Sequence, residues 1–201
     1  MEIIRFSSIR PEPWRNGGGV TREIARHPRE ASQDGSWDWR VSIAEVGKAG
    51  DFSAFPGMER VISVIDGELL VLTVDGAEHA MEKYRPFRFS GDAASSSKLP
   101  TGDIRDLNVI ARRGAYKGYL SILELSKKRA HPVFEGQLAI LLEGKASVTE
   151  GAGEDAGTGS GDPVELGRYD TVVGSDASSP ELLGRGFVAI VSLDPADPAD
   201  A

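Results

Sequence analysis

The chain has 201 residues, of which 40% are hydrophobic, and a formal net charge of −8. This length and apolar content are enough for a real core, in one large domain or two small ones, and the negative charge makes nucleic acid and membrane surfaces unexpected partners. The absence of cysteine excludes disulfides, thiolate metal sites and cysteine catalysis, and it suits a reducing compartment. The start MEIIRFSSIR lacks the regions of a signal peptide, and no apolar run reaches about 20 residues, so we expect a cytoplasmic protein.

The first informative segment along the chain is residues 13–23, PWRNGGGVTRE. It joins an aromatic ring, a guanidinium and an amide to three consecutive glycines, Gly17–Gly19. An ordered run of glycine costs backbone entropy, so it implies a positive φ or a very close backbone approach. Two interpretations stand at this point: a backbone that approaches a ligand, or a plain glycine turn with Trp14 as a core anchor.

Alternating and β-branched segments predict an all-β chain. No window of a dozen residues has a 3.6-residue period, so helix should be scarce. Many short strands with turns every 8–12 residues are typical of a sandwich or barrel. The predicted strands are 20–25, 37–44, 60–65, 68–74, 77–82, 86–89, 108–112, 118–125, 137–142, 145–149, 169–173 and 187–193.

Asp-Gly pairs at 66–67 and 75–76 lie at the ends of apolar runs, and each predicts a hairpin turn. The run 60–73 recurs loosely at 138–149, because both contain a β-run, an acidic residue with glycine, and a second β-run. The recurrence indicates a duplicated two-stranded unit, with two unrelated hairpins as the alternative. We expect a first barrel at residues 1–115 and a second at 116–194, with strands that can be exchanged between the halves. Residues 150–163 predict a mobile, Gly-rich acidic hairpin tip, and residues 195–201 a disordered tail.

Four motifs together resemble the HutD/Ves family. They are PWRNGGGVTRE at 13–23, WRVSIAEV at 39–46, GDFSAFPGMER at 50–60 followed by Asp66-Gly67, and DLNVIARR at 106–113. The resemblance covers roughly residues 10 to 113 and rests on strand pattern alone after Gly118. It implies a cupin-type β-barrel, in a two-barrel or bicupin arrangement, in bacterial proteins often linked to histidine utilisation. The acidic tip at 150–163 is a departure from the family pattern.

Many cupins hold a metal with two closely spaced histidines, a carboxylate and a third histidine, because the ion needs several converging ligands. The three histidines here, His27, His79 and His131, are far apart and never form His-x-His. His27 and His131 each precede a proline at an expected loop position. We therefore expect no metal and no other cofactor.

Polar side chains on the predicted strands indicate an anion site in the first barrel. Arg40 and Ser42 share one face of their strand, Asn108 and Arg112 share a face of another, and Arg60 opens the central strand. A buried guanidinium needs an anion, and an organic carboxylate matches its planar donors. An amide at position 16 and bare backbone N–H groups of the glycines could add donors. The predicted ligand-binding residues are Trp14, Arg15, Asn16, Gly17, Gly18, Arg40, Ser42, Arg60, Asn108 and Arg112.

The alternative is that Glu23, Glu45 or Glu59 satisfies these arginines in structural ion pairs, or that the arginines are solvated. Catalytic residues stay unassigned, because the sequence has no Gly-x-Ser-x-Gly motif and no histidine close to Ser42 or Ser53.

The leading hypothesis is a protein that binds a small anionic metabolite, a carboxylate such as urocanate or formylglutamate, and modulates histidine utilisation. The alternative is a metal-independent cupin enzyme, an isomerase or hydrolase, that acts on a similar acid. A buried carboxylate facing Arg40 and Arg60 would favour the enzyme, whereas a pocket of donors without an acid or base would favour the binder. A third candidate is a β-scaffold that works through protein contacts, which predicts an exposed apolar patch. A homodimer is compatible with the sequence.

Overall fold

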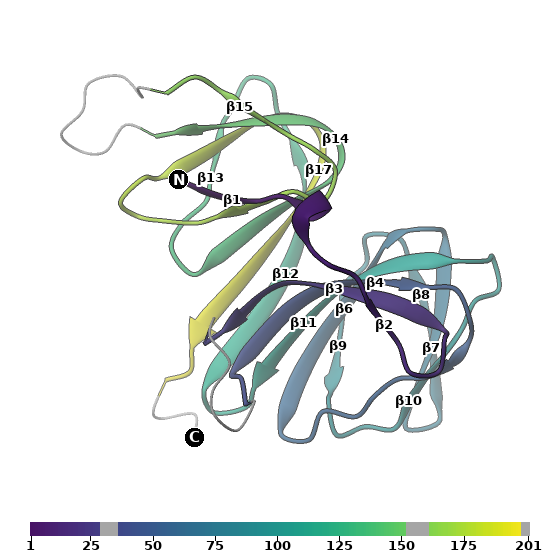
Figure 1. Cartoon of the computed structure of the whole chain (residues 1–201). Coiled ribbons are helices and arrows are strands. Elements are labelled where there is room, and N and C mark those ends of the chain that lie inside the picture. Colours follow the sequence, from purple (N-terminus) through teal and green to yellow (C-terminus); the bar gives the residue numbers. More distant parts are fainter. Residues whose placement is uncertain (29–35, 152–160, 198–201) are drawn as a thin grey trace. The chain divides into compact units, whose positions relative to one another are not determined.

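The computed structural model describes residues 1–28, 36–151 and 161–197, and strands joined by turns and loops make up most of this part of the chain (Figure 1). Within them the one helical segment is the three-residue 3-10 turn η1 (Phe6–Ser8), so the all-β prediction is confirmed. In the same part of the chain, no helix has the length and hydropathy needed to cross a bilayer. Most of the predicted tip at 150–163 and the end of the predicted tail at 195–201 lie outside the described residues.

The chain divides into two compact units. The first unit comprises Ile9–Tyr119 with the residues from Leu193 onward, and the second comprises Leu120–Ser192 with Met1–Ser8. This grouping differs from domains at 1–115 and 116–194 because β1 (Glu2–Ile4) pairs antiparallel with β16 (Thr171–Val173). The start of the chain therefore completes a sheet of the second unit.

The first unit contains two sheets whose apolar faces share a core. The six-stranded sheet has the order β2 (Glu12–Pro13), β3 (Gly19–His27), β4 (Trp39–Val46), β11 (Ile104–Arg112), β6 (Met58–Asp66), β9 (Phe87–Ser90). The four-stranded sheet has the order β5 (Gly50–Asp51), β10 (Ser95–Lys98), β7 (Leu69–Val74), β8 (Ala77–Glu82). Ile62 and Val64 of the first sheet pack with Leu70, Leu72 and Met81 of the second, and all five side chains are at most 2% exposed. This core fixes which face of β4, β6 and β11 points inward.

The second unit is built on a seven-stranded sheet. Its main order is β1, β16, β14 (Gln137–Glu150), β17 (Pro180–Pro195), β12 (Tyr116–Leu125), with β13 (His131–Pro132) paired to β17 and β15 (Val164–Leu166) paired to β14. Buried side chains from several of these strands form its core, among them Leu141, Val148, Val172 and Val188.

The predicted hairpin at Asp66-Gly67 is wrong, whereas the one at Asp75-Gly76 is confirmed. Strands β6 and β7, which flank Gly67, belong to different sheets, and a Cβ on this residue would lie 2.8 Å from the Asp103 carbonyl oxygen. Asp75 and Gly76 have φ values of 47° and 84° between the paired residues Val74 and Ala77, which is the geometry of a two-residue hairpin turn.

The second copy of the predicted hairpin, at Glu143-Gly144, is also wrong. Strand β14 runs through these residues without a turn, and its register against β17 shifts between Leu141 and Glu143. Gly144 has a φ of 97°, so the pair forms a bulge in one long strand. Glycine after an acidic residue permits a positive φ. A positive φ occurs in a hairpin turn, in a connection between two sheets and in a bulge, so the dipeptide alone does not predict a hairpin.

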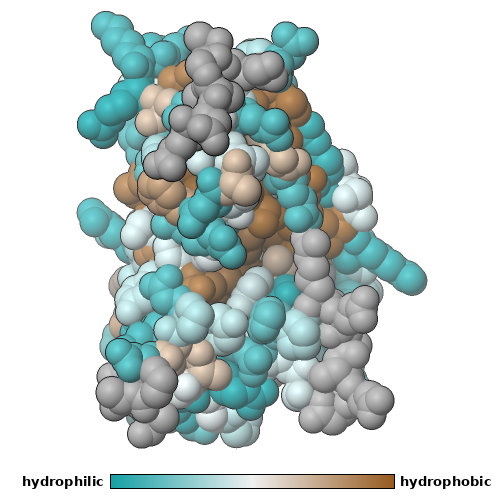
Figure 2. Space-filling model, turned by 90° about the vertical axis from the view of Figure 1, so that its left-hand side faces the viewer, coloured by the Kyte–Doolittle hydropathy of each residue, from teal (hydrophilic) through white to brown (hydrophobic). Residues whose placement is uncertain are grey.

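Large hydrophobic side chains that are exposed in the described part of the chain are Met1, Tyr119, Leu123 and Phe134. On the face seen in Figure 2, hydrophobic side chains lie in several groups among hydrophilic ones. Tyr119 and Leu123 both belong to β12, with exposed Ser121 between them. Single exposed hydrophobic residues of this kind are ordinary on protein surfaces.

Candidate functional site

A cavity of about 600 Å³ lies in the first unit and contains most of the predicted ligand-binding residues. We call it the arginine pocket and define its centre by Arg40 and Ser42 of β4, Arg60 of β6, and Asp106 and Asn108 of β11. Its volume is within the range of small-molecule sites.

Sheet register brings these side chains together. In β11, Ile110 pairs with Arg40 on one side and with Arg60 on the other, and Asn108 pairs with Ser42. Because side chains alternate along a strand, residues at these positions share the inward face of three adjacent strands. The period-two placement of Arg40 and Ser42 on one face agrees with the sequence prediction.

Arg60 is buried among aromatic rings. Its side chain is 3% exposed, and its guanidinium carbon lies 5.7, 5.2 and 4.9 Å from the ring centres of Phe52, Phe55 and Phe89. One of its terminal nitrogens donates to the Ser53 carbonyl oxygen at 3.3 Å, whereas Nε is buried without a hydrogen-bond partner. Burial lowers the pKa of Arg60 to about 10, although the carboxyl of Asp106 opposes this change.

Arg40 shares one of these rings. Its guanidinium carbon lies 5.1 Å from the ring centre of Trp37 and 5.3 Å from that of Phe55, so the Phe55 ring contacts both guanidinium groups. The Nε of Arg40 is also buried without a partner, and burial lowers the pKa of this residue. The rings stabilise the cations by cation–π attraction but offer them no acceptor. Donors of two arginines therefore remain available to an anion.

The glutamates that could have neutralised these arginines pair elsewhere. Glu23 contacts Arg26 at 3.5 Å. Glu45 forms an ion pair with Arg22. Glu59 contacts Arg113 at 3.2 Å. In the described part of the chain, none of these three carboxylates forms an ion pair with Arg40 or Arg60, although Glu23 acts on Arg40 at longer range and opposes the lowering of its pKa by burial.

Asp106 is a pocket residue that the sequence reasoning missed. It is 1% exposed, and its Oδ1 is buried without a hydrogen-bond partner. Burial raises the pKa of Asp106 to about 7, and the positive charge of Arg60 limits the rise. A signal for this residue existed, because Asp106 lies two positions before Asn108 and so shares its strand face.

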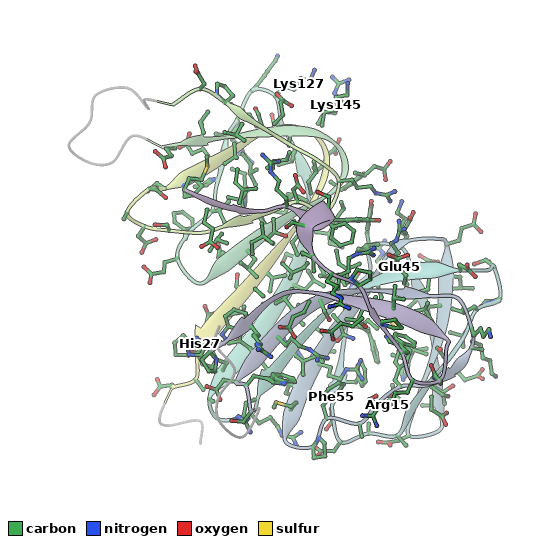
Figure 3. All side chains as sticks on the ribbon, viewed as in Figure 1. Arg15, His27, Glu45, Phe55, Lys127 and Lys145 are labelled. Carbon is green, nitrogen blue, oxygen red and sulfur yellow. The ribbon has the colours of Figure 1, made fainter. Side chains whose placement is uncertain are left out.

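The turn between β2 and β3 supplies the rim of the pocket. Nε1 of Trp14 donates to Oγ1 of Thr21 at 2.8 Å, which holds the indole in place. Arg15 and Asn16 also line the pocket and are exposed. Figure 3 shows Arg15 and Phe55 at the same end of the first unit.

The glycines of this turn have the predicted backbone features, a positive φ and a close backbone approach, but two of their N–H groups are not free as predicted. Gly17 has a φ of 66°, and a Cβ on Gly19 would lie 2.3 Å from the carbonyl oxygen of Glu45. The N–H of Gly17 donates to the Trp14 carbonyl at 3.0 Å, and that of Gly18 donates to Oδ1 of Asn16 at 2.9 Å. The expectation of bare N–H groups here is wrong for these two residues, because the turn uses them itself.

Gly17 and Gly18 line a separate hollow of about 640 Å³. Three charged side chains of this hollow are paired with one another, since Arg105 contacts Glu45 at 3.5 Å and Asp66 at 3.2 Å. Arg112 also lies outside the arginine pocket: its Nε donates to Oδ1 of Asp38 at 3.0 Å. The arginine pocket is the better candidate site because the buried Nε atoms of Arg40 and Arg60 have no hydrogen-bond partner.

The three histidines lie on three different sheets, in β3, β8 and β13. His27 stacks on Trp39 with ring centres 6.0 Å apart, and His79 contacts Phe87 at 4.4 Å. Among residues 1–28, 36–151 and 161–197, no three or more histidine and carboxylate side chains cluster as a metal would require. The expectation of a metal-free protein stays a prediction.

Two curated relatives match the chain over about 60% of its length. Protein Ves of Citrobacter koseri is 37% identical over 126 residues, which are 60% of this chain and 64% of that protein. An uncharacterized 21.2 kDa protein in the hutC 3' region of Pseudomonas putida is 39% identical over 121 residues, or 60% of this chain and 63% of that protein. Each match therefore spans less than two thirds of the relative.

Solved structures match almost the whole chain. HutD from Pseudomonas fluorescens SBW25 is 30% identical with a TM-score of 0.76, covering 98% of this chain and 99% of that one. A cupin 2 conserved barrel domain protein from Leptotrichia buccalis has a TM-score of 0.57 at 9% identity, covering 97% and 96% of the two chains, and it supports the cupin-type fold alone. The family model described as HutD matches residues 6–190. Because this match takes in strands of both units, including those that build the arginine pocket, the chain belongs to the HutD family.

Proposed function

We propose that the chain binds a small organic acid in the arginine pocket and thereby modulates histidine utilisation in the cytoplasm. The observation that carries the proposal is the pair of buried guanidinium groups, Arg40 and Arg60, whose Nε atoms have no hydrogen-bond partner. Burying a cation without an acceptor is costly, and a carboxylate supplies acceptors that match the guanidinium plane. The Phe55 ring contacts both guanidinium groups, which places the two cations close to one another.

The link to histidine utilisation comes from the relatives. The similar Pseudomonas putida protein is encoded in the hutC 3' region, and the similar Pseudomonas fluorescens structure is named HutD. Urocanate and formylglutamate are the acids to test first.

Calorimetric titration of both acids against the wild type, Arg60→Ala and Arg60→Lys tests the proposal. We expect Arg60→Ala to weaken binding by about 1.5–3 kcal/mol, the range of a hydrogen bond to a charged group. Arg60→Lys should recover part of this loss, because an ammonium lacks the two-pronged geometry of the guanidinium. Arg112→Ala is the matched control, since this arginine lies outside the pocket and pairs with Asp38. Equal affinity in all four proteins would refute the proposed site.

A metal-independent enzyme that acts on such an acid is the second candidate. Asp106 is the buried carboxylate near Arg60 that would favour this function, and a carboxyl with a pKa of about 7 can exchange a proton near neutral pH. Proton NMR of each acid incubated with the protein would detect conversion. If an enzyme is present, Asp106→Asn should abolish conversion while the acid still binds. An unchanged spectrum with tight binding would exclude this candidate for that acid.

A further inference from the structure

The arginine pocket contains acceptors as well as cations. Resting on the proposed carboxylate site, we infer that the ligand is bifunctional: its carboxylate pairs with Arg40 and Arg60, and a separate N–H group of the ligand donates to Asp106. The ligand class is therefore an organic acid that also carries an imidazole, amide or ammonium N–H.

Asp106 has no donor from its own sheet. Its neighbours in register are Ala44 on β4 and Val64 on β6, and neither side chain can donate a hydrogen bond. Oδ1 of Asp106 and Oδ1 of Asn108, two residues further along the same face, are both buried without partners. Unmade hydrogen bonds on buried acceptors are costly, so two adjacent ones point to a donor that arrives with the ligand.

Charge complementarity leads to the same class of ligand. The charged side chain that interacts most strongly with the carboxyl of Asp106 is Arg60, which lies on the neighbouring strand β6. A plain carboxylate would occupy the arginines, bring a second negative charge close to Asp106 and leave its oxygen unpaired. An acid with an N–H group satisfies the cations and the acceptor together, and the cavity of about 600 Å³ has room for both groups.

Two matched pairs of acids test the inference on the unmodified protein. The first is urocanate against 3-(1,3-oxazol-4-yl)acrylate, in which a ring oxygen replaces the N–H and the other ring nitrogen is kept. The second is N-formylglutamate against 2-formyloxyglutarate, in which an ester oxygen replaces the amide N–H. At pH 8 we expect the N–H acid of each pair to bind at least about tenfold more tightly, because a site built to accept a hydrogen bond discriminates strongly against a ligand without the donor.

Asp106→Asn assigns the preference to this residue. The variant should lose most of the discrimination within each pair while it retains or improves binding of the oxazole and ester acids, because the negative charge beside their carboxylates is gone. Asp103→Asn is the matched control, since this aspartate is exposed and does not line the arginine pocket. Circular dichroism of each variant reports its folding.

The outcomes separate the inference from the function on which it rests. Tight but equal binding of both acids in each pair would overturn the N–H inference and leave the carboxylate site standing. Absence of binding for all four acids would overturn both. An equal loss of affinity for all four acids in folded Asp106→Asn would show that Asp106 organises the pocket rather than contacts the ligand, which also overturns the inference. The comparison within each pair needs only the wild type, so it holds even if the variant fails to fold.

Discussion

Replacing Asp106 by asparagine should change how the stability of the protein depends on pH. The carboxyl is 1% exposed, and its Oδ1 has no hydrogen-bond partner. Burial raises its pKa from the usual 3.8 to about 7, because removing the charged form from water costs more than the attraction of Arg60 returns. The folded protein therefore holds a proton on this group that the unfolded chain releases near pH 4.

The magnitude follows from the linkage between protonation and folding. A pKa difference of about 3 units corresponds to about 4 kcal/mol, which is an upper bound on the effect. In the window between the two pKa values the folded state binds more protons than the unfolded state, so the wild type loses stability as pH rises from about 4 to about 7. Asparagine does not titrate, so this loss disappears in the variant. The stability of Asp106→Asn relative to the wild type should grow by about 2.5 kcal/mol between pH 5 and pH 8.

Urea unfolding followed by far-ultraviolet circular dichroism, at half-unit pH intervals from 5 to 8, measures this difference. Asp51→Asn serves as the control because it removes an exposed carboxylate of the same pocket. A difference between Asp106→Asn and the wild type that stays constant across the series would refute the reasoning. It would mean that Asp106 is already ionised at pH 5 and is satisfied within the folded protein.

Three further predictions concern the turn, the control arginine and metal content. Gly19→Ala should destabilise the protein by about 3 kcal/mol, because a Cβ would lie 2.3 Å from the Glu45 carbonyl oxygen. Gly17→Ala should destabilise it by only about 1–2 kcal/mol, because the φ of this residue is positive. Equal urea midpoints for the two variants would contradict this order. Arg112→Ala should lower stability by less than about 1 kcal/mol, since its ion pair is partly exposed, and should leave calorimetric affinity for the acids unchanged. Elemental analysis of the purified protein should find no stoichiometric transition metal, and about one zinc, iron, nickel or manganese per chain would overturn that expectation.

Local pattern was sufficient to predict part of the site. Alternation in the segment 39–46 placed Arg40 and Ser42 on one face, and the same rule placed Asn108 and Arg112 on one face of the segment 106–113. These predictions agree with the structure because the period of two is a property of the extended backbone itself. The rule failed for Arg112, which shares that periodicity but binds Asp38 outside the pocket.

Other features of the site depend on contacts between distant segments. The register of β11 between β4 and β6 brings Arg40 and Arg60 to either side of Ile110, and the ring of Phe55 then contacts both guanidinium groups. The pairing of Glu45 on β4 with Arg22 on β3 is likewise a contact between two strands. These choices follow from which side chains the sheets bring within reach.

By itself, the sequence determined the all-β class, the strand faces and the need for glycine in the turn after Trp14, because periodicity and φ are local properties of the chain. The tertiary structure decided that Asp66-Gly67 joins two sheets, that the glycine N–H groups are used within their own turn, and that Asp106 lies buried without a partner close to Arg60. The physical reason is the same in each case. The sequence determines which residues can adopt a positive φ, donate a hydrogen bond or carry a charge. The groups that packing places around each residue decide how that capacity is used.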